Sequence, residues 1–240
     1  MMKTSNVDRL IEKTREMAIN FELKPGSRIN ETSLSKELGA SRTPLREALN
    51  RLVAEGFLTF QTGKGFFCRA LDPKRIMDLY EARVAIEVEA IRLACIRATD
   101  MELDVFAKFL DATEPDYLTK MDVSDAVHVD EDFHLYIARL SHNDELLRML
   151  ENLNGRIRFV RSVNLKSIHD TERSQRAQTR LSAHRRILEA LRTRDAEVAA
   201  NTLRSHIERR WEEATEAVQK AYAQIYVPDE MHKEKNREMT

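Results

Sequence analysis

The sequence is poor in the residues and segments that secreted and membrane proteins need. Its two cysteines, Cys68 and Cys95, are too few for a disulfide framework and fit a reducing cytoplasm. No run of about 18 apolar residues occurs, which excludes a membrane-spanning helix, and the first residues contain no apolar signal core. With 42% hydrophobic and 33% charged residues in a chain of 240, the sequence predicts a cytoplasmic globular protein.

Glycine is also scarce, and its distribution divides the chain. Five of the six glycines lie at or before Gly65, so turns that need a positive φ are concentrated in the first part. Residues 1–70 carry 12 Lys and Arg against 8 Asp and Glu, whereas the remainder carries 27 against 32. We therefore predict one domain over residues 1–70 and an all-helical domain over residues 74–228. The charged segment 229–240 has no apolar stripe and is predicted to be disordered.

Two short helices separated by a glycine turn are predicted in the first domain. Apolar residues at helical spacing place these helices at residues 32–38 and 43–52. Thr32 is the predicted N-cap of the first helix, and Gly39 supplies the left-handed residue that ends it. Two helices joined in this way predict a helix-turn-helix.

Basic side chains follow the second helix and the segment after it. Arg42, Arg46 and Asn50 are spaced by four and lie opposite the leucines. Arginines near a helix N-terminus favour phosphate and can read guanine, although an ordinary solvated helix face has the same spacing. Two β-prone segments flank Gly63 and Lys64, which predicts a hairpin whose tip lysine meets a phosphate. A helix-turn-helix followed by such a hairpin is a winged helix.

These motifs resemble the DNA-binding domain of GntR-type bacterial regulators. The resemblance covers residues 6–70 and rests on GSRINE at 26–31, LGASRTPLREAL at 38–49 and GKG at 63–65. It implies that a homodimer binds a near-palindromic operator in double-stranded DNA. The implied DNA-contacting residues are Ser41, Arg42, Thr43, Arg46, Gly63 and Lys64. Thr32 stands where the best-understood members have an arginine, so the operator need not match theirs.

Inward-facing polar residues distinguish the predicted helical domain. Arg83 and Glu87, four residues apart, fall on the apolar stripe of the helix predicted over residues 74–97. They either pair with each other to fix the packing or serve a ligand. Asp130 and His134, also four apart, share one face of the next long helix, where both can bind the same cation.

Two histidines on the last predicted helices complete this cluster. His184 lies 11 residues before Asp195 and His206 lies 11 after it, so an antiparallel helical hairpin brings them to the same height. One carboxylate and three imidazoles suit one divalent ion per chain, which can be Zn, Mn, Ni or Fe. Four protein ligands leave open positions for an anionic organic acid, and Arg83 can take a second carboxylate.

The second domain resembles the effector domain of the FadR branch of GntR regulators. The resemblance covers about residues 74–220 and rests on YEARVAIE at 80–87, DEDFH at 130–134, SHN at 141–143 and HRRILEA at 184–190, with His206. In the metal-binding members, one Asp and three His hold a divalent cation. The matching residues are Asp130, His134, His184 and His206. The resemblance also implies repression, and a small carboxylate effector with Arg83 and Asn143 near its pocket.

Three functions fit these patterns. The first is a transcriptional regulator whose operator binding responds to a carboxylate metabolite at the metal, acting in the bacterial cytoplasm on the nucleoid. The second is a metal-dependent enzyme acting on an organic acid, because open metal positions can activate water. The third is a direct metal sensor, in which the ion itself is the signal. We favour the regulator over the enzyme, since no nucleophile signature or Gly-rich phosphate loop accompanies the cluster.

Overall fold

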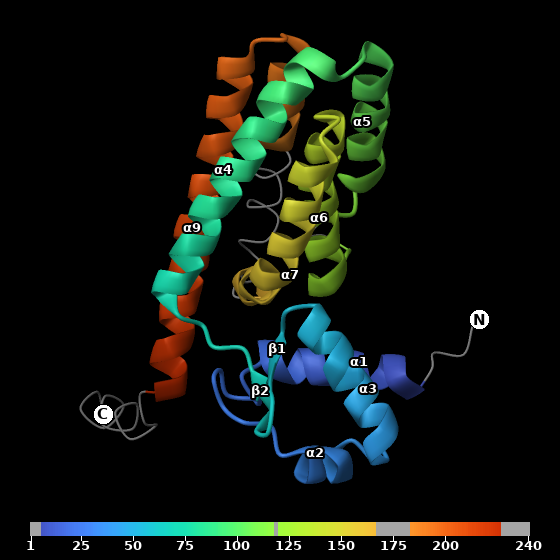
Figure 1. The fold of residues 1–240 in the computed structure, drawn as a ribbon, viewed down its shortest axis with the longest axis vertical. Helices are drawn as coiled ribbons and strands as arrows, with labels where there is room; N and C mark the ends of the chain where they lie inside the picture. Colours follow the sequence, from blue (N-terminus) through green and yellow to red (C-terminus); the bar gives the residue numbers. More distant parts are fainter. Residues whose placement is uncertain (1–5, 118–119, 167–182, 227–240) are drawn as a thin grey trace, which may run out of the picture. The chain divides into compact units, whose positions relative to one another are not determined.

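The computed structural model describes residues 6–117, 120–166 and 183–226, with side chains as far as residue 219 (Figure 1). One compact unit contains the residues up to Leu71 together with those from Ala214 on, and the other contains Asp72–Glu213. The tail predicted at residues 229–240 lies outside the described residues. No helix in the described ranges combines the length and the apolar character needed to cross a bilayer.

The first unit contains a winged helix-turn-helix. Its elements are α1 (Asn6–Ile19), α2 (Glu31–Glu37), α3 (Arg42–Ala54), β1 (Leu58–Gln61) and β2 (Gly65–Cys68). The two strands are antiparallel, with Leu58 opposite Cys68 and Gln61 opposite Gly65. Leu10 of α1, the leucines of α3, and Leu58 and Phe66 of the hairpin are fully buried, which fixes α3 against the sheet. The predicted winged helix is therefore confirmed.

The structure confirms the residue that was predicted to end α2 but not the residue that was predicted to cap its start. Gly39 has a φ of +60° and ends α2 as expected. The prediction that Thr32 caps α2 was wrong, because Oδ1 of Asn30 accepts hydrogen bonds from the backbone N–H groups of Thr32 and Ser33, each at 3.1 Å. The extended backbone of Asn30 places its short side chain over the first turn, so the helix begins one residue earlier.

The second unit is an antiparallel bundle of helices. Its elements are α4 (Pro73–Arg97), α5 (Asp100–Thr113), α6 (Val123–Leu140), α7 (Asp144–Lys166), a helix at residues 183–192 and the part of α9 (Ala196–Tyr226) that ends at Glu213. Asp72 caps α4, and a capping box of Thr99 and Glu102 starts α5. Phe106, Phe133 and other fully buried apolar side chains form the core. The predicted all-α second domain is confirmed.

Both cysteines are buried and unpaired. Cys68 lies in β2 and Cys95 lies near the end of α4. Burial raises the pKa of the Cys68 thiol to about 12 and also raises the pKa of the Cys95 thiol. Both thiols therefore stay protonated at neutral pH.

Candidate metal centre and nucleic-acid interface

Four buried side chains converge inside the helical unit. Asp130 and His134 lie one turn apart on α6, His184 lies on the helix at residues 183–192, and His206 lies on α9. One potential ligand atom from each lies within 4.8 Å of those from the others. The ring centroids of His184 and His206 are 5.1 Å apart, as two histidines equidistant from the turn at Asp195 should be. The structure thus brings together all four residues predicted as metal ligands.

Several polar atoms of this cluster have no hydrogen-bond partner in the described part of the chain. They are Oδ1 of Asp130, Nε2 of His134 and both ring nitrogens of His206. A buried polar atom without a partner costs about 1–3 kcal/mol. A cation bound between these residues would satisfy one ligand atom of each at once, so the donor set fits a divalent metal ion.

The charges around the cluster hold the ligand atoms in the forms that metals need. Burial disfavours the ionised carboxylate of Asp130, but Arg161 and the nearby histidines outweigh it and keep its pKa well below the usual value. Burial and the neighbouring histidines lower the pKa of His206 well below its usual value, so its ring is neutral. An ionised carboxylate beside neutral imidazoles is ready to bind a metal without losing protons.

A second carboxylate, Glu87, orients His134. Oε2 of Glu87 lies 2.6 Å from Nδ1 of His134, and Oε1 accepts a hydrogen bond of 2.5 Å from Nε of Arg83. Arg83 and the pairing of His134 lower the pKa of Glu87 to about 2, against the effect of its burial. The neutral imidazole therefore donates from Nδ1 and presents Nε2 to the cluster, as metal-binding histidines do. Arg83 and Glu87 form a mutual pair, which is one of the two roles that their spacing allows.

Arginines gather next to the cluster. A small cavity is lined by Tyr80, Arg83, Asp130, Arg161, Asn164 and Arg210, among others. Both Nη atoms of Arg83 are buried and lack a hydrogen bond to any described residue. Nε of Arg161 lies 3.7 Å from Oδ2 of Asp130. Unsatisfied guanidinium groups beside a candidate metal site favour an anion.

Sequence reasoning missed Arg161 and Arg210. Arg161 interrupts the buried apolar face of α7, and Arg210 follows His206 by one helical turn on α9. The spacing of both arginines could have predicted that they are buried near the cluster, because each lies on an apolar helix stripe, where a charged side chain needs a partner.

Asn143, predicted near the effector pocket, has a structural contact instead. Its Oδ1 accepts hydrogen bonds from the backbone N–H groups of Glu145 at 3.1 Å and Leu146 at 3.2 Å. It therefore caps α7, and it is not among the residues that line the cavity beside the cluster. Arg83, predicted with it, does line that cavity.

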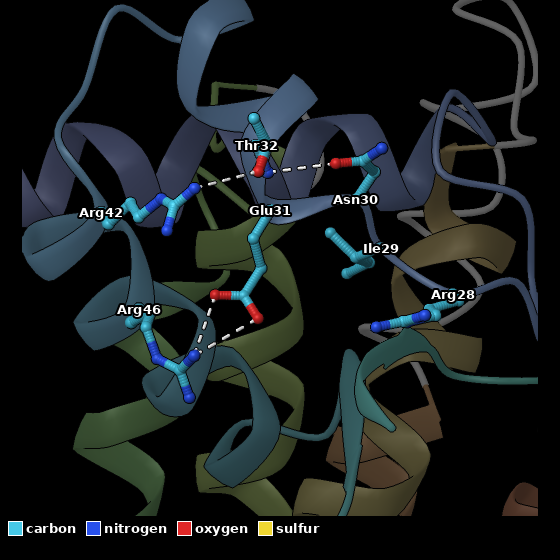
Figure 2. Close-up of a pocket in the computed structure, with 7 residues that line it drawn as sticks. All are labelled: Arg28, Ile29, Asn30, Glu31, Thr32, Arg42 and Arg46. Carbon is cyan, nitrogen blue, oxygen red and sulfur yellow. Dashed lines mark hydrogen bonds and ion pairs between the residues drawn. The ribbon is translucent and has the colours of Figure 1, made fainter. Parts of the chain in front are cut away.

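The predicted DNA-contacting residues are all exposed in the winged helix. Ser41, Arg42, Thr43 and Arg46 belong to the start of α3, and Gly63 and Lys64 form the turn between the strands. Gly63 has a φ of +75°. Arg42 and Arg46 line a pocket of about 430 Å³ with Arg28, Ile29, Asn30, Glu31 and Thr32 (Figure 2). Of the six predicted residues, Arg42 and Arg46 line this pocket, and the other four do not.

A winged helix followed by a helical domain with a buried polar centre defines a class of DNA-binding transcriptional regulators. Residues 6–68 match the family of bacterial regulatory proteins named gntR, and residues 78–209 match the FCD domain. The chain therefore belongs to the gntR family and carries an FCD domain.

Relatives and solved structures agree with this assignment. The chain is 40% identical to the Nta operon transcriptional regulator of Aminobacter aminovorans over 212 residues, covering 88% of this chain and 95% of that protein. It is 33% identical to YdhC of Bacillus subtilis, an uncharacterized HTH-type transcriptional regulator, covering 80% and 83%. The structure of Escherichia coli McbR/YncC has a TM-score of 0.64 at 23% identity, covering 88% and 98%, which shows a shared fold. These sequence relatives are transcriptional regulators and not enzymes.

The metal-free protein should lose stability as the pH falls below 6.5. Burial and Arg83 lower the pKa of His134 below 6.5, and burial lowers the pKa of His206 further. The unfolded chain therefore binds protons at pH values where the folded chain does not. The free energy of unfolding is therefore independent of these two rings' protonation above pH 6.5, and below that pH it falls by up to about 1.4 kcal/mol per pH unit for each ring.

Denaturant unfolding of chelator-treated protein between pH 7.5 and pH 5 measures this slope. His206→Leu removes one titrating ring. It should reduce the slope of the unfolding free energy against pH by up to about 1.4 kcal/mol per pH unit, which corresponds to one proton. An identical slope in the variant would show that His206 does not titrate in this range.

Proposed function

We propose that this regulator represses transcription as a homodimer on a near-palindromic operator, and that a small carboxylate bound at a divalent metal centre controls its operator affinity. The observation that supports the metal centre is the convergence of four buried ligand atoms within 4.8 Å. The DNA-binding domain is proposed at residues 1–70 and the effector domain at residues 74–228. The protein would act in the bacterial cytoplasm on the nucleoid.

Asp130, His134, His184 and His206 would hold the ion, and Arg83 would hold the effector. A divalent ion with one ionised carboxylate and three neutral imidazoles leaves a charge of about +1, which favours an anion. Zn, Mn, Ni and Fe all accept this donor set. Arg83 has both Nη atoms available for a carboxylate, and the cavity that it lines adjoins Asp130. The ion supplies a positive centre and open coordination positions to the acid.

Ser41, Arg42, Thr43 and Arg46 would present the start of α3 to the major groove, and Gly63 and Lys64 would contact the backbone. Exposed arginines in the first turns of a recognition helix read base edges, while a lysine at a hairpin tip neutralises phosphate. The effector would act by binding one arrangement of the dimer better than another and so changing operator affinity.

A thermal-shift experiment tests the effector half of this proposal. Chelator-treated protein is loaded separately with Zn²⁺, Mn²⁺ and Ni²⁺, and with Fe²⁺ under anaerobic conditions, and is then screened with succinate, malate, citrate and gluconate. We expect at least one acid to raise the Tm of a metal-loaded sample and to leave the chelator-treated sample unchanged. A Tm that responds to the ion but to no acid, with DNA affinity that follows the free ion, would favour a direct metal sensor. No response to any ion would contradict the metal centre.

Arg46→Ala should weaken operator binding by about 1–3 kcal/mol, because Arg46 is proposed to contact a base edge. Fluorescence anisotropy with an operator duplex selected from a random-sequence pool measures this loss. Arg51→Ala is the matched control, because Arg51 lies on the same helix, pairs with Glu47 at 2.9 Å and does not line the pocket. Unchanged operator affinity in Arg46→Ala would remove Arg46 from the DNA interface.

A further inference from the structure

Glu31 is the one carboxylate among the described residues that line the pocket beside α3. The pocket also contains the three arginines Arg28, Arg42 and Arg46 (Figure 2). The side chain of Glu31 is 25% exposed, whereas that of Arg46 is 52% exposed. A partly buried carboxylate in a pocket that otherwise suits phosphate has a cost for DNA binding, so its presence calls for an explanation.

Glu31 holds Arg46 from one side, and an aromatic ring holds it from another. Nη1 of Arg46 lies 3.2 Å from Oε2 and 3.5 Å from Oε1 of Glu31 (Figure 2). The Cζ atom of Arg46 lies 5.6 Å from the centroid of the Phe66 ring in β2. Nε and Nη2 of Arg46 have no hydrogen bond to the residues that the structure describes. One N–H edge of a fixed guanidinium therefore remains available to an outside ligand.

Glu31 also reaches the hairpin. A Cβ atom built on Gly65 would lie 3.8 Å from Oε1 of Glu31. The carboxylate at the start of α2 thus lies against both α3 and the first residue of β2, the two elements that carry the proposed DNA contacts. Through these contacts Glu31 holds the Arg46 guanidinium next to the start of β2.

A carboxylate in this position affects base and phosphate contacts in opposite directions. A guanine accepts two parallel N–H bonds from one edge of an arginine, and a guanidinium that is already oriented loses less conformational entropy on making them. A phosphate at the same arginine would meet the carboxylate charge at short range. Glu31 therefore favours operator binding and disfavours sequence-independent binding, and the ratio of the two affinities is specificity.

We propose that Glu31 is a specificity-determining residue for DNA recognition, which orients Arg46 towards a base edge and penalises phosphate contacts in the same pocket. The proposal rests on the proposed function in one respect, namely that Arg46 contacts DNA. It does not depend on the metal centre or on the effector.

The test compares the affinities of four purified full-length proteins for two DNA probes. The probes are a duplex selected by the wild-type protein from a random-sequence pool and poly(dI-dC), each measured at three salt concentrations. The variants are Glu31→Gln, Glu31→Asp and the control Glu47→Gln. Glu47 lies on α3 and pairs with Arg51, so its replacement removes the same charge from the same unit without touching Arg46.

We expect Glu31→Gln to lower the ratio of selected-duplex affinity to poly(dI-dC) affinity about tenfold or more, by weakening the first and strengthening the second. Glu31→Asp should lower the ratio less, because the charge remains but the reach is shorter. Glu47→Gln should leave the ratio within twofold. A ratio for Glu31→Gln within twofold of either the wild type or Glu47→Gln would overturn the proposal.

The Arg46→Ala variant separates this proposal from the proposed function. If Arg46→Ala lowers operator affinity and Glu31→Gln leaves the ratio unchanged, only the role of Glu31 fails. If Arg46→Ala changes nothing, the recognition helix itself is misassigned and the role of Glu31 fails with it. Circular dichroism of Glu31→Gln and Glu31→Asp checks that the winged helix is intact in the variants compared.

Discussion

His206→Leu should abolish the stabilisation of the protein by metal and leave the metal-free protein at least as stable as the wild type. Both ring nitrogens of His206 are buried without a hydrogen bond to a described residue, so the metal-free fold bears a cost of about 1–3 kcal/mol that leucine removes. An ion present at a thousandfold its Kd stabilises the wild type by about 4 kcal/mol. For a chain of this size that energy raises the Tm by about 10 °C.

Thermal unfolding with and without chelator, together with metal analysis of the purified proteins, measures both effects. His128→Leu is the control, because His128 is an exposed histidine on the same helix as Asp130 and His134. The control should bind the ion with the stoichiometry of the wild type. Equal metal content in His206→Leu would exclude this ring from the centre, and a large loss of stability without metal would give the ring a structural role.

Arg83→Met should destabilise the helical unit by about 3–5 kcal/mol. Arg83 and Glu87 are both almost fully buried, and Arg83 supplies the positive charge nearest to the Glu87 carboxylate. Methionine fills most of the space of the arginine stem but leaves a buried carboxylate without its counter-charge, and breaking a buried pair in this way has the stated cost.

Glu87→Gln combined with Arg83→Met is the partner measurement. The double variant should recover much of the lost stability, because the buried charge that Arg83→Met leaves behind is gone. Denaturant unfolding of the wild type, both single variants and the double variant completes a double-mutant cycle, which measures the interaction energy between Arg83 and Glu87. A double variant as unstable as the sum of the two single variants would mean that Arg83 and Glu87 stabilise the fold independently, despite the 2.5 Å between them.

The convergence of the four candidate metal ligands could be predicted from the sequence because helical geometry is regular. Asp130 and His134 are four residues apart, and His184 and His206 are equidistant from a turn, so the rise per residue fixes their heights. The two-domain order followed from the placement of glycine, since positive φ is needed at Gly39 and Gly63 but rarely in long helices.

The remaining features depend on contacts that periodicity does not contain. The family resemblance implies that Asn143 lies near the effector pocket, and in the structure its side chain caps α7. Arg161 reaches Asp130 from a different helix, and the contact of Glu31 with Arg46 joins residues 15 apart across a turn. Each of these is set by side-chain rotamers and by the angles between helices, and spacing along one helix constrains neither of them.

The buried, protonated thiols have a practical consequence for studying conformational change. Thiol reagents attack the thiolate, and neither Cys68 nor Cys95 offers one on the surface. A cysteine introduced at an exposed position, such as Thr62→Cys in the hairpin turn, would therefore be the only site that maleimide dyes modify readily. Spin labels or fluorophores attached there would report the separation of the two wings in the proposed homodimer, without first removing the native cysteines.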